Sequence, residues 1–259
     1  MKILGIIPAR YASTRFPGKP LADIRGKPMI QRVYEQAKKC KLLSEVVVAT
    51  DDERIASAVK KFKGKVIMTS AKHASGTDRC FEALKKSGGK YDAVINIQGD
   101  EPFIHPDQIS KVAKCFTGSS SARSNLSPFG GAGGGGVQIA TLIKKITRIH
   151  ELTNHNTVKV VVNKNMEALY FSRTPIPYYR GEDLLKWMKS HTYYKHIGIY
   201  GYRADVLSAI TRLKRSSLEI AESLEQLRWL ENGYKITVSL TDKESVSIDS
   251  PQDLKKLSK

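Results

Sequence analysis

Metal-binding and disulfide patterns are missing from this sequence. Its 259 residues include only three cysteines, Cys40, Cys80 and Cys115, and no Cys-x-x-Cys pair. An odd number of widely spaced cysteines is typical of reduced thiols, so we expect a cytoplasmic protein without a disulfide framework. The six histidines lack ligand spacing as well: His150 and His155, for example, stand five residues apart, which does not place them on one helix face. A zinc site is therefore not expected.

Long hydrophobic runs are absent too. No stretch approaches the roughly 20 apolar residues that a membrane-spanning helix needs. The apolar run after Met1 and Lys2 is too short for the hydrophobic part of a signal peptide, and a proline and an arginine follow it at once. We therefore expect no membrane insertion and a cytoplasmic location.

Acidic residues are scarce relative to basic ones. The 25 Asp and Glu residues against 43 Lys and Arg residues give a formal net charge of +18. Such a field attracts polyanions, whether nucleotides, nucleic acids or anionic membranes. The lysines are spread over many segments, in pairs such as Lys38-Lys39 and Lys144-Lys145, and no aromatic residues interleave with them as in a single-strand binding surface. We therefore expect no nucleic-acid partner, and the excess of positive charge has no functional explanation.

In the first half of the chain, short apolar runs rich in β-branched residues alternate with amphipathic segments. The expected strands are 3–7, 46–49, 66–68 and 93–97, and the expected helices are 29–39, 53–61, 78–86 and 107–116. This alternation predicts βαβ units, and hence an α/β fold with a mainly parallel sheet that helices cover on both sides.

Beyond residue 116 the pattern changes. Residues 117–136, TGSSSARSNLSPFGGAGGGG, are rich in serine and glycine, which predicts a flexible loop. The expected strands after it are 137–143, 158–162, 167–173, 196–202 and 235–240, with one helix over 217–231. Because few helices separate these strands, we expect mixed or antiparallel pairing. We also expect one domain over 1–259, with a smaller lobe within about 150–215.

The first expected strand runs into a cationic loop. Arg10, Ser13, Arg15 and Lys19 stand here among small residues and prolines. Arginine side chains and backbone N–H groups in a rigid loop match phosphate oxygens, so we interpret the loop as an anion-binding site. It does not match the Walker motif, in which a serine or threonine follows Gly-Lys where this chain has proline. On these residues alone, an ordinary basic surface turn is the alternative.

Other polar residues fall at the carboxyl ends of expected strands, where α/β sheets place ligands. Thr50 and Asp51 follow one strand, and Gln98 follows another. The segment Ser75-Gly76-Thr77 stands before an expected helix, where Thr77 could cap free N–H groups. A small residue, a glycine and a hydroxyl group at that place also suit recognition of a base or a ribose.

Two carboxylates are candidates for holding Mg²⁺. Asp100 lies beyond the strand 93–97, where it can be held rigidly toward a metal and nucleotide phosphates. Asp249 directly follows Val246-Ser247-Ile248 and precedes Ser250-Pro251. On the residues alone, a turn or cap role stays open for Asp100 and an N-cap role for Asp249.

The second half offers weaker candidates. His196 and Arg173 each stand beside an expected strand, and a structural role is open for His196. Glu219 recurs with Glu222 and Glu225 every three residues on one expected helix, a spacing typical of a solvated acidic face.

These residues lie in blocks that resemble the 3-deoxy-manno-octulosonate (KDO) cytidylyltransferase family, also called CMP-KDO synthetases. The blocks, in matching order over nearly the whole chain, are IIPARYASTRFPGKPL, VVVATDD, HASGTDR, NIQGDEP, VKVVVN, ALYFSRTPIP, HIGIYGYR, LEIAESLEQLRWLENG and IDSPQDL. The resemblance implies a three-layer, Rossmann-like nucleotide-diphospho-sugar transferase fold with a smaller dimerisation lobe, and hence a homodimer. It also implies that CTP and KDO give CMP-KDO and pyrophosphate for lipopolysaccharide synthesis, with Mg²⁺ as cofactor.

The resemblance also implies roles for individual residues. It places CTP at Arg10, Ser13, Arg15, Lys19, Thr50, Asp51, Ser75, Gly76 and Asp100, Mg²⁺ at Asp100 and Asp249, and the sugar at Gln98, Arg173, His196 and Glu219. The catalytic residues would be Arg10, Lys19, Asp100 and Asp249, with Arg10 and Lys19 offsetting charge as pyrophosphate leaves.

Two alternatives stay open. One is a cytidylyltransferase for a related acidic sugar such as 8-amino-KDO; a sialic acid enzyme should have a more glycine-rich opening loop without PGKPL. The other is a basic nucleic-acid-binding module on an inactive scaffold, against which the retained Asp100 and Asp249 argue. The chain departs from the family in its charge and in the long stretch Ser119–Gly136. We expect that stretch to be a surface insertion that leaves the chemistry intact, because it avoids every matched block.

Overall fold

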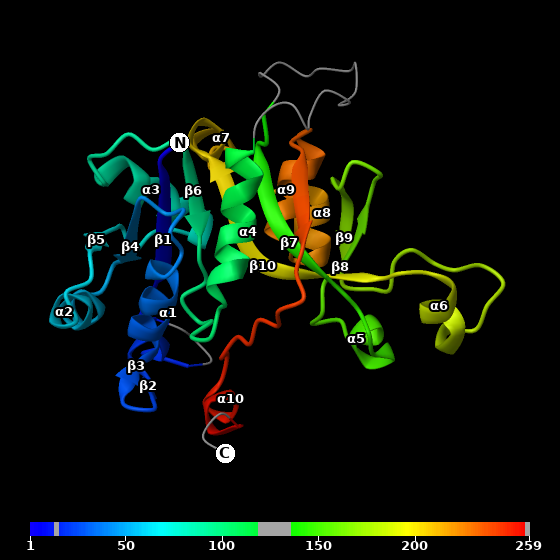
Figure 1. The fold of residues 1–259 in the computed structure, drawn as a ribbon, viewed down its shortest axis with the longest axis horizontal. Coiled ribbons are helices and arrows are strands. Elements are labelled where there is room, and N and C mark those ends of the chain that lie inside the picture. The colour runs from blue at the N-terminus through cyan, green and yellow to red at the C-terminus, as the bar shows by residue number, and fades with distance from the viewer. Residues whose placement is uncertain (13–15, 119–135, 257–259) are drawn as a thin grey trace. The chain divides into compact units, whose positions relative to one another are not determined.

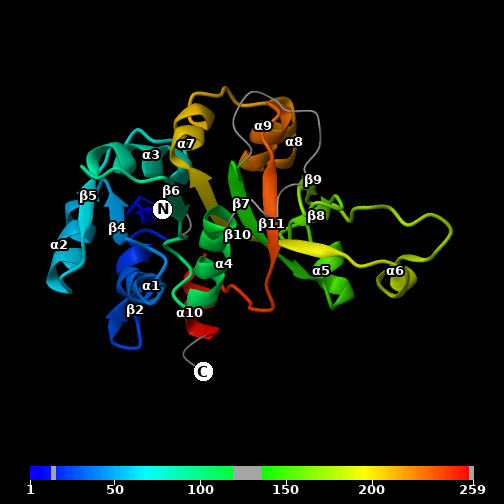
Figure 2. The same ribbon diagram turned by 45° about the horizontal axis from the view of Figure 1, so that its top comes forward.

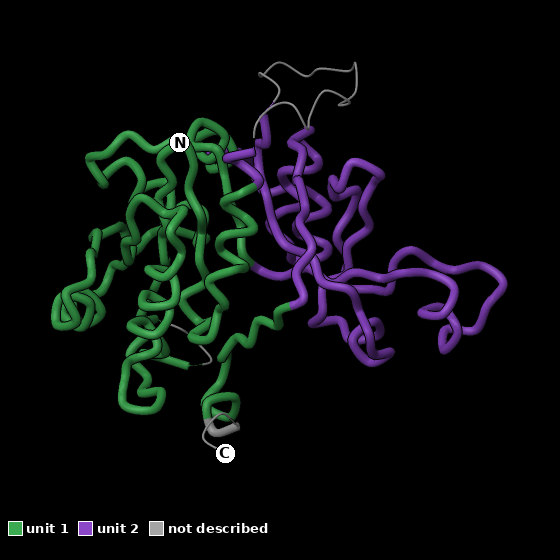
Figure 3. The backbone as a smooth tube through the Cα atoms, viewed as in Figure 1, with its two compact units in different colours: residues 1–114, 199–211, 243–259 green, residues 115–198, 212–242 purple. Residues whose placement is uncertain are grey.

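The computed structural model of the protein describes residues 1–12, 16–118 and 136–256 (Figure 1). Ser13, Arg15 and nearly all of the loop predicted at 117–136 lie outside these ranges. The chain divides into two compact units: residues 1–114, 199–211 and 243–259 form the first, and residues 115–198 and 212–242 form the second (Figure 3). Of the smaller lobe predicted within 150–215, residues 199–211 belong to the first unit and the others to the second.

The first unit alternates strands and helices along the chain, as the sequence predicts. Its strands are β1 (Ile3–Ala9), β2 (Asp23–Ile24), β3 (Lys27–Pro28), β4 (Glu45–Thr50), β5 (Val66–Met68) and β6 (Ala93–Asn96). Its helices are the 3₁₀ turn η1 (Lys19–Leu21), α1 (Met29–Lys38), α2 (Glu53–Lys61), α3 (Gly76–Lys86), α4 (Pro106–Thr117, to residue 114), α7 (Ala204–Ile210) and α10 (Pro251–Lys256). Strand β10 (Tyr194–Arg203) runs through both units and contributes residues 199–203 to the first.

The strands of the first unit form a mixed, mainly parallel sheet in the order β10-β6-β1-β4-β5. β1 pairs in parallel with both β4 and β6, and β4 pairs in parallel with β5, whereas β10 runs antiparallel to β6. Figure 2 shows α3 and α7 on one side of these strands and α1 and α4 on the other. This arrangement confirms the predicted three-layer α/β fold.

The core of this unit follows from the apolar pattern. Ile3, Leu4, Ile6 and Ile7 of β1 are completely buried, because helices cover both faces of the strand and leave no polar alternation along it. Helix α1 buries one stripe of its surface, formed by Met29, Ile30, Val33, Tyr34 and Ala37. The spacing of these residues matches the helical period and predicted the helix.

The strand order creates a ligand-binding edge. After β1 the chain continues through β4 and β5 on one side of β1, and it then returns to form β6 on the other side. The loops that leave β1 and β6 therefore run in opposite directions, which opens a crevice at the carboxyl ends of these two strands.

The second unit has fewer helices between its strands. It contains β7 (Ile139–Lys145), β8 (Lys159–Val162), β9 (Ala168–Ser172), β11 (Ile236–Leu240) and residues 194–198 of β10, with helices α5 (Ile149–Thr153), α6 (Leu184–Ser190), α8 (Ser217–Glu222) and α9 (Glu225–Glu231). β7 and β11 pair in parallel, whereas β8 pairs antiparallel with both β9 and β10. Pairing here is mixed, as predicted.

The single helix predicted over 217–231 is wrong. Ser223 adopts the left-handed conformation, with φ 51° and ψ 47°, and ends α8, and Leu224 is extended before α9 begins. In the sequence, Leu218, Ala221, Leu224 and Leu227 keep an apolar spacing of three residues across the break, so the pattern alone did not indicate it. In the structure only Leu224 and Leu227 of these four are buried. In neither unit does a described helix have the length and apolarity needed to cross a membrane.

Candidate active site

A cavity of about 360 Å³ opens at the carboxyl ends of β1 and β6 in the first unit. The residues that line it come from five separate parts of the chain: Pro8, Ala9 and Arg10; Lys19 and Pro20; His73, Ala74, Ser75, Gly76 and Arg79; Gln98, Gly99 and Asp100; and Asp249. The cavity therefore collects the opening loop and the loops before α3, after β6 and before α10, each of which the sequence singled out.

The backbone of the opening loop is fixed next to Lys19. Gly18 has a φ of 72° and its N–H donates to the carbonyl oxygen of Tyr11 at 2.9 Å, which closes the loop. A side chain on Gly18 would be strained by this φ and would also lie 3.1 Å from the Tyr11 ring. The 3₁₀ turn η1 follows, and its buried Pro20 anchors Lys19 at the cavity wall.

Lys19 lies between the two carboxylates that the sequence suggested for a metal. Its Nζ is 2.7 Å from Oδ2 of Asp100 and 3.2 Å from Oδ1 of Asp249. The backbone N–H of Ile248 donates to the carbonyl oxygen of Asp100 at 3.0 Å, which brings Asp249 beside Asp100. Ile248 is completely buried against Ile24 and Met29, so the segment before α10 is anchored.

Asp249 itself is not the cap of α10. Ser250 takes that position: its N–H donates to Asp253 at 3.0 Å, and the N–H of Asp253 donates back to the Ser250 hydroxyl at 3.3 Å. The carboxylate of Asp249 is thereby left to face Lys19 and the cavity.

Ser75 and Gly76 form the start of α3 at the cavity. Ser75 is the N-cap: its hydroxyl accepts from the N–H of Asp78 at 3.1 Å, and the Asp78 carboxylate accepts from the N–H of Ser75 at 3.2 Å. The prediction that Thr77 caps this helix is wrong, because Thr77 already lies within α3 and is buried. Helix α3 thus begins two residues before the predicted Asp78 and directs its first N–H groups toward this loop.

Thr50 and Asp51 lie at the end of β4 and do not line the cavity. Thr50 is completely buried, and its hydroxyl accepts from the N–H of Asp52 at 3.2 Å. Asp51 forms an ion pair of 3.1 Å with Arg79, which does line the cavity. Arg79 was missed as a site residue; the only signal in the sequence was its place in the block HASGTDR, three residues after Gly76.

Glu101, beside Asp100, was also missed. It is buried, and this burial, reinforced by Asp100, raises the pKa of Glu101 to about 7, although a hydrogen bond with Ser245 opposes the change. Its Oε2 atom has no hydrogen-bond partner among the described residues. A carboxyl group that is partly protonated near neutrality adds less negative charge behind Asp100 than a fully ionised one would.

The other candidates lie in the second unit and are held by neighbouring groups. The Arg173 guanidinium donates to the carbonyl oxygens of Glu222, His155 and Ser223, at 2.6, 3.2 and 3.3 Å. Glu219 is buried and forms a 2.8 Å ion pair with Arg228. The described contacts of both residues therefore lie within the second unit.

His196 is held on one side by Thr141, whose hydroxyl oxygen is 2.9 Å from Nε2, and on the other by the edge-on ring of Phe171. Desolvation lowers the pKa of His196 to about 3, although part of the residue stays accessible. The ring is therefore neutral over the physiological range and suits hydrogen bonding better than ionic binding.

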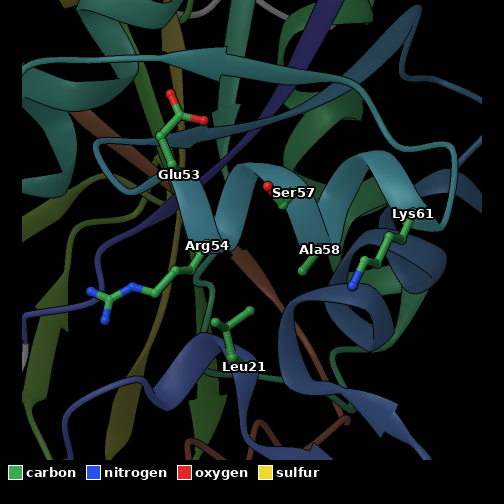
Figure 4. A pocket seen from close by; sticks show the side chains of 6 residues that line it. All are labelled: Leu21, Glu53, Arg54, Ser57, Ala58 and Lys61. Atoms are coloured by element: carbon green, nitrogen blue, oxygen red, sulfur yellow. The ribbon is translucent and has the colours of Figure 1, made fainter.

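A second hollow lies between α2 and the 3₁₀ turn (Figure 4). It is lined by Leu21, Glu53, Arg54, Ser57, Ala58 and Lys61. Arg54 forms an ion pair of 2.7 Å with Asp52. None of the residues predicted to bind CTP, the sugar or a metal lines this hollow. The cavity at β1 and β6 is therefore the candidate active site.

The sheet is mainly parallel, and cationic side chains, a helix N-terminus and two carboxylates meet at the carboxyl ends of β1 and β6, where the strand order reverses. This is the arrangement of an enzyme that binds a nucleotide. Comparison with known proteins narrows this class. Residues 4–236 match the model of the cytidylyltransferase family. The chain is 58% identical to the 3-deoxy-manno-octulosonate cytidylyltransferase of Parabacteroides distasonis, over 99% of this chain and 96% of that protein, and 58% identical to the protein of the same name from Bacteroides thetaiotaomicron, over 98% and 96%.

A solved structure of the same family is also similar over nearly the whole chain. The enzyme described as CMP:2-keto-3-deoxy-manno-octonic acid synthetase complexed with CTP superposes with a TM-score of 0.85 at 44% identity, over 99% of this chain and 97% of that one. The chain belongs to the 3-deoxy-manno-octulosonate cytidylyltransferase family.

Proposed function

We propose that this protein activates KDO: it transfers CMP from CTP to the sugar and releases pyrophosphate, for lipopolysaccharide synthesis. The observation that carries the proposal is the meeting of Arg10, Lys19, Asp100 and Asp249 in one cavity, in a chain 58% identical to relatives of that name over nearly its whole length. The KDO hydroxyl attacks the α-phosphorus of CTP, the bond to the β-phosphate oxygen breaks, and the hydroxyl proton passes to solvent. No covalent bond to the enzyme is needed, so catalysis rests on positioning and on charge stabilisation.

The triphosphate fits the cationic side of the cavity. Arg10 follows β1 and Lys19 begins the 3₁₀ turn, so both project from backbone that is fixed before the nucleotide arrives. Preorganised positive groups stabilise the charge that develops on leaving pyrophosphate. Ser75 and Gly76, at the N-terminus of α3, and the Asp51–Arg79 pair suit the ribose and base side of CTP; Ser13, Arg15 and Thr50 complete the proposed set.

The two carboxylates fit Mg²⁺. Asp100 and Asp249 already direct one oxygen each toward a single cation, the Lys19 ammonium group. Mg²⁺ is commonly bound by one or two carboxylates, which this pair can supply, together with substrate phosphates and water. When bound, Mg²⁺ would withdraw negative charge from the phosphate oxygens.

The residues proposed for the acidic sugar are described unit by unit. Gln98 lines the cavity, whereas Arg173, His196 and Glu219 belong to the second unit. A neutral His196 ring can exchange hydrogen bonds with sugar hydroxyl groups, and the Arg173 guanidinium can attract the sugar carboxylate. We further propose that the protein acts as a homodimer in the cytoplasm.

Pyrophosphate release tests this function. With CTP, Mg²⁺ and KDO, we expect stoichiometric pyrophosphate and CMP-KDO, and release that fails without KDO. Parallel assays with 8-amino-KDO establish which sugar has the higher kcat/KM; a preference for the amino sugar would overturn the assignment to KDO.

Asp100→Asn should lower turnover by roughly 10³-fold or more while the protein stays folded, because the lost charge matters most in the transition state. Asp107→Asn, in the first turn of α4, is the matched control.

A further inference from the structure

Lys19 and the proposed metal share the same two ligands. The Lys19 Nζ is within hydrogen-bonding distance of Asp100 and Asp249 together, and a small cation that accepts both carboxylates needs the place that this ammonium group occupies. Two nearby carboxylates repel each other unless a positive charge lies between them. The Lys19 ammonium group supplies that charge here, and a metal ion that binds the same two oxygens has to displace it.

All three residues are held through their backbones, and they differ in the length of their side chains. The N–H of Ile248 donates to the backbone carbonyl oxygen of Asp100, and the N–H of Asp249 donates to Asp253 at 3.3 Å. Lys19 is held in the 3₁₀ turn, but its ammonium group is carried on a long flexible stem, whereas an aspartate carboxylate lies close to its own backbone. Lys19 is thus the member that can move without disturbing the fold.

Solvent exposure makes an exchange accessible. The side chains of Lys19, Asp100 and Asp249 are 16, 27 and 39% exposed. Ion pairs in such surroundings are screened and contribute modestly to stability, so a divalent ion of higher charge can displace the lysine. A displaced ammonium group needs another anion nearby, and the Arg10 side of the same cavity is where we place the triphosphate.

We propose that Lys19 is an exchangeable counter-ion: it holds the carboxylate pair together until a divalent metal takes the pair and Lys19 turns to the triphosphate. This inference rests on the proposed function, because it assumes that CTP and Mg²⁺ bind in this cavity. Its consequence is that binding of the metal and binding of CTP are thermodynamically coupled. Metal alone must compete with Lys19, whereas metal with CTP does not, so each ligand strengthens binding of the other by the same factor.

Mn²⁺ binding measured by electron paramagnetic resonance, with and without CTP and in the absence of KDO, tests the proposal. Lys19→Met removes the competitor, so Mn²⁺ alone should bind about tenfold more tightly than to the wild-type protein, and the coupling between CTP and Mn²⁺ should fall by a similar factor. Arg10→Met removes one positive charge from the same cavity without vacating the carboxylate pair. It should change Mn²⁺ affinity much less.

The controls separate direct competition from a general charge effect. Lys19→Gln serves as a second neutral variant should Lys19→Met fold poorly, as judged by circular dichroism, and Lys19→Arg should keep Mn²⁺ affinity near the wild-type value. Equal effects of Lys19→Met and Arg10→Met, or unchanged Mn²⁺ affinity in both neutral Lys19 variants, would overturn the proposal. If wild-type protein makes CMP-KDO but the variants bind Mn²⁺ unchanged, only this inference fails. If Lys19→Met tightens Mn²⁺ binding but the wild-type protein releases no pyrophosphate from CTP and KDO, the proposed function fails instead.

Discussion

Arg79 of α3 lies 3.1 Å from Asp51, which directly follows β4, and also donates to the hydroxyl of Thr69 at 2.6 Å. Both charged side chains are largely buried, with 5 and 18% exposure, so neither can be left alone without a large desolvation cost. We expect Arg79→Met to lower the free energy of unfolding by about 3 kcal/mol and to weaken CTP binding. Urea unfolding measures the first effect and calorimetric titration the second.

The double variant Arg79→Met/Asp51→Asn provides the check on this pair. Because it removes both charges, its loss of unfolding free energy should be smaller than the sum of the two single losses. Strictly additive losses would show that Arg79 and Asp51 act independently.

Gly99 and Gly76 both line the cavity but differ in the space around them. A Cβ atom on Gly99 would lie 2.7 Å from the backbone oxygen of Pro8, whereas on Gly76 the nearest atom, in the side chain of Pro8, is at an ordinary 3.5 Å. Gly99→Ala should therefore destabilise the protein by about 1 to 3 kcal/mol, because β1 backbone has to shift. Gly76→Ala should leave stability unchanged or raise it by up to about 1 kcal/mol, since alanine favours the helix.

The same pair separates folding from ligand binding. A loss of CTP affinity in a fully stable Gly76→Ala variant would mean that the nucleotide approaches this backbone closely. Thermal unfolding in the absence of nucleotide gives the stability order; equal melting temperatures for the two variants would contradict the packing argument.

Lys159 is completely buried in the second unit, and its Nζ donates to the carbonyl oxygens of Asn154, Thr157 and Arg173. Desolvation lowers the pKa of Lys159 to about 8, so the ammonium form still dominates at neutral pH. Lys159→Met should cost about 3 kcal/mol or more in unfolding free energy, because three carbonyl groups lose their donor. It should also raise the KM for KDO, since the Arg173 backbone loses one of its supports.

Lys164→Met, at an exposed position of the same unit, is the matched control and should stay within about 0.5 kcal/mol of the wild-type protein. Similar unfolding free energies for both variants would mean that the carbonyl oxygens around Lys159 find other donors.

His196 should make stability depend on pH in the acid range. Its pKa is about 3 in the folded protein against an ordinary value of 6.5. Between these values the unfolded chain binds a proton that the folded protein does not, so the free energy of unfolding falls as pH falls from about 6.5 toward 3, by at most about 1.4 kcal/mol per pH unit. His196→Gln should lack this part of the acid sensitivity.

Urea unfolding at about pH 7.5 and about pH 5 measures the difference, and His191→Gln, at an exposed position after α6, is the control. His191→Gln should show the same pH dependence as the wild-type protein. Identical pH dependence in the His196 variant would mean that His196 is protonated in the folded state as readily as in the unfolded chain.

Several structural features followed from local sequence pattern. Strands β1, β4, β5 and β6 and helices α1 to α4 were predictable, because a buried parallel strand reads as a continuous apolar run and a surface helix as an apolar stripe. The short elements β2, β3, η1, α7 and α10 of the same unit were not predicted. The break at Ser223 was not predictable, because the apolar spacing continues through it. Arg79 was overlooked because its burial against Asp51 depends on the packing of α3 on the sheet.

By itself, the sequence determined which residue types follow which strands. Arg10 follows β1, and Gln98 and Asp100 follow β6, so the end of each strand is enough to place these residues at the cavity. Tertiary structure alone decided that Lys19 meets Asp249, a residue 230 positions away, through the hydrogen bond between Ile248 and Asp100. The physical reason is that periodicity records whether a side chain is buried, whereas the partner of a charge depends on which distant segments the core brings together.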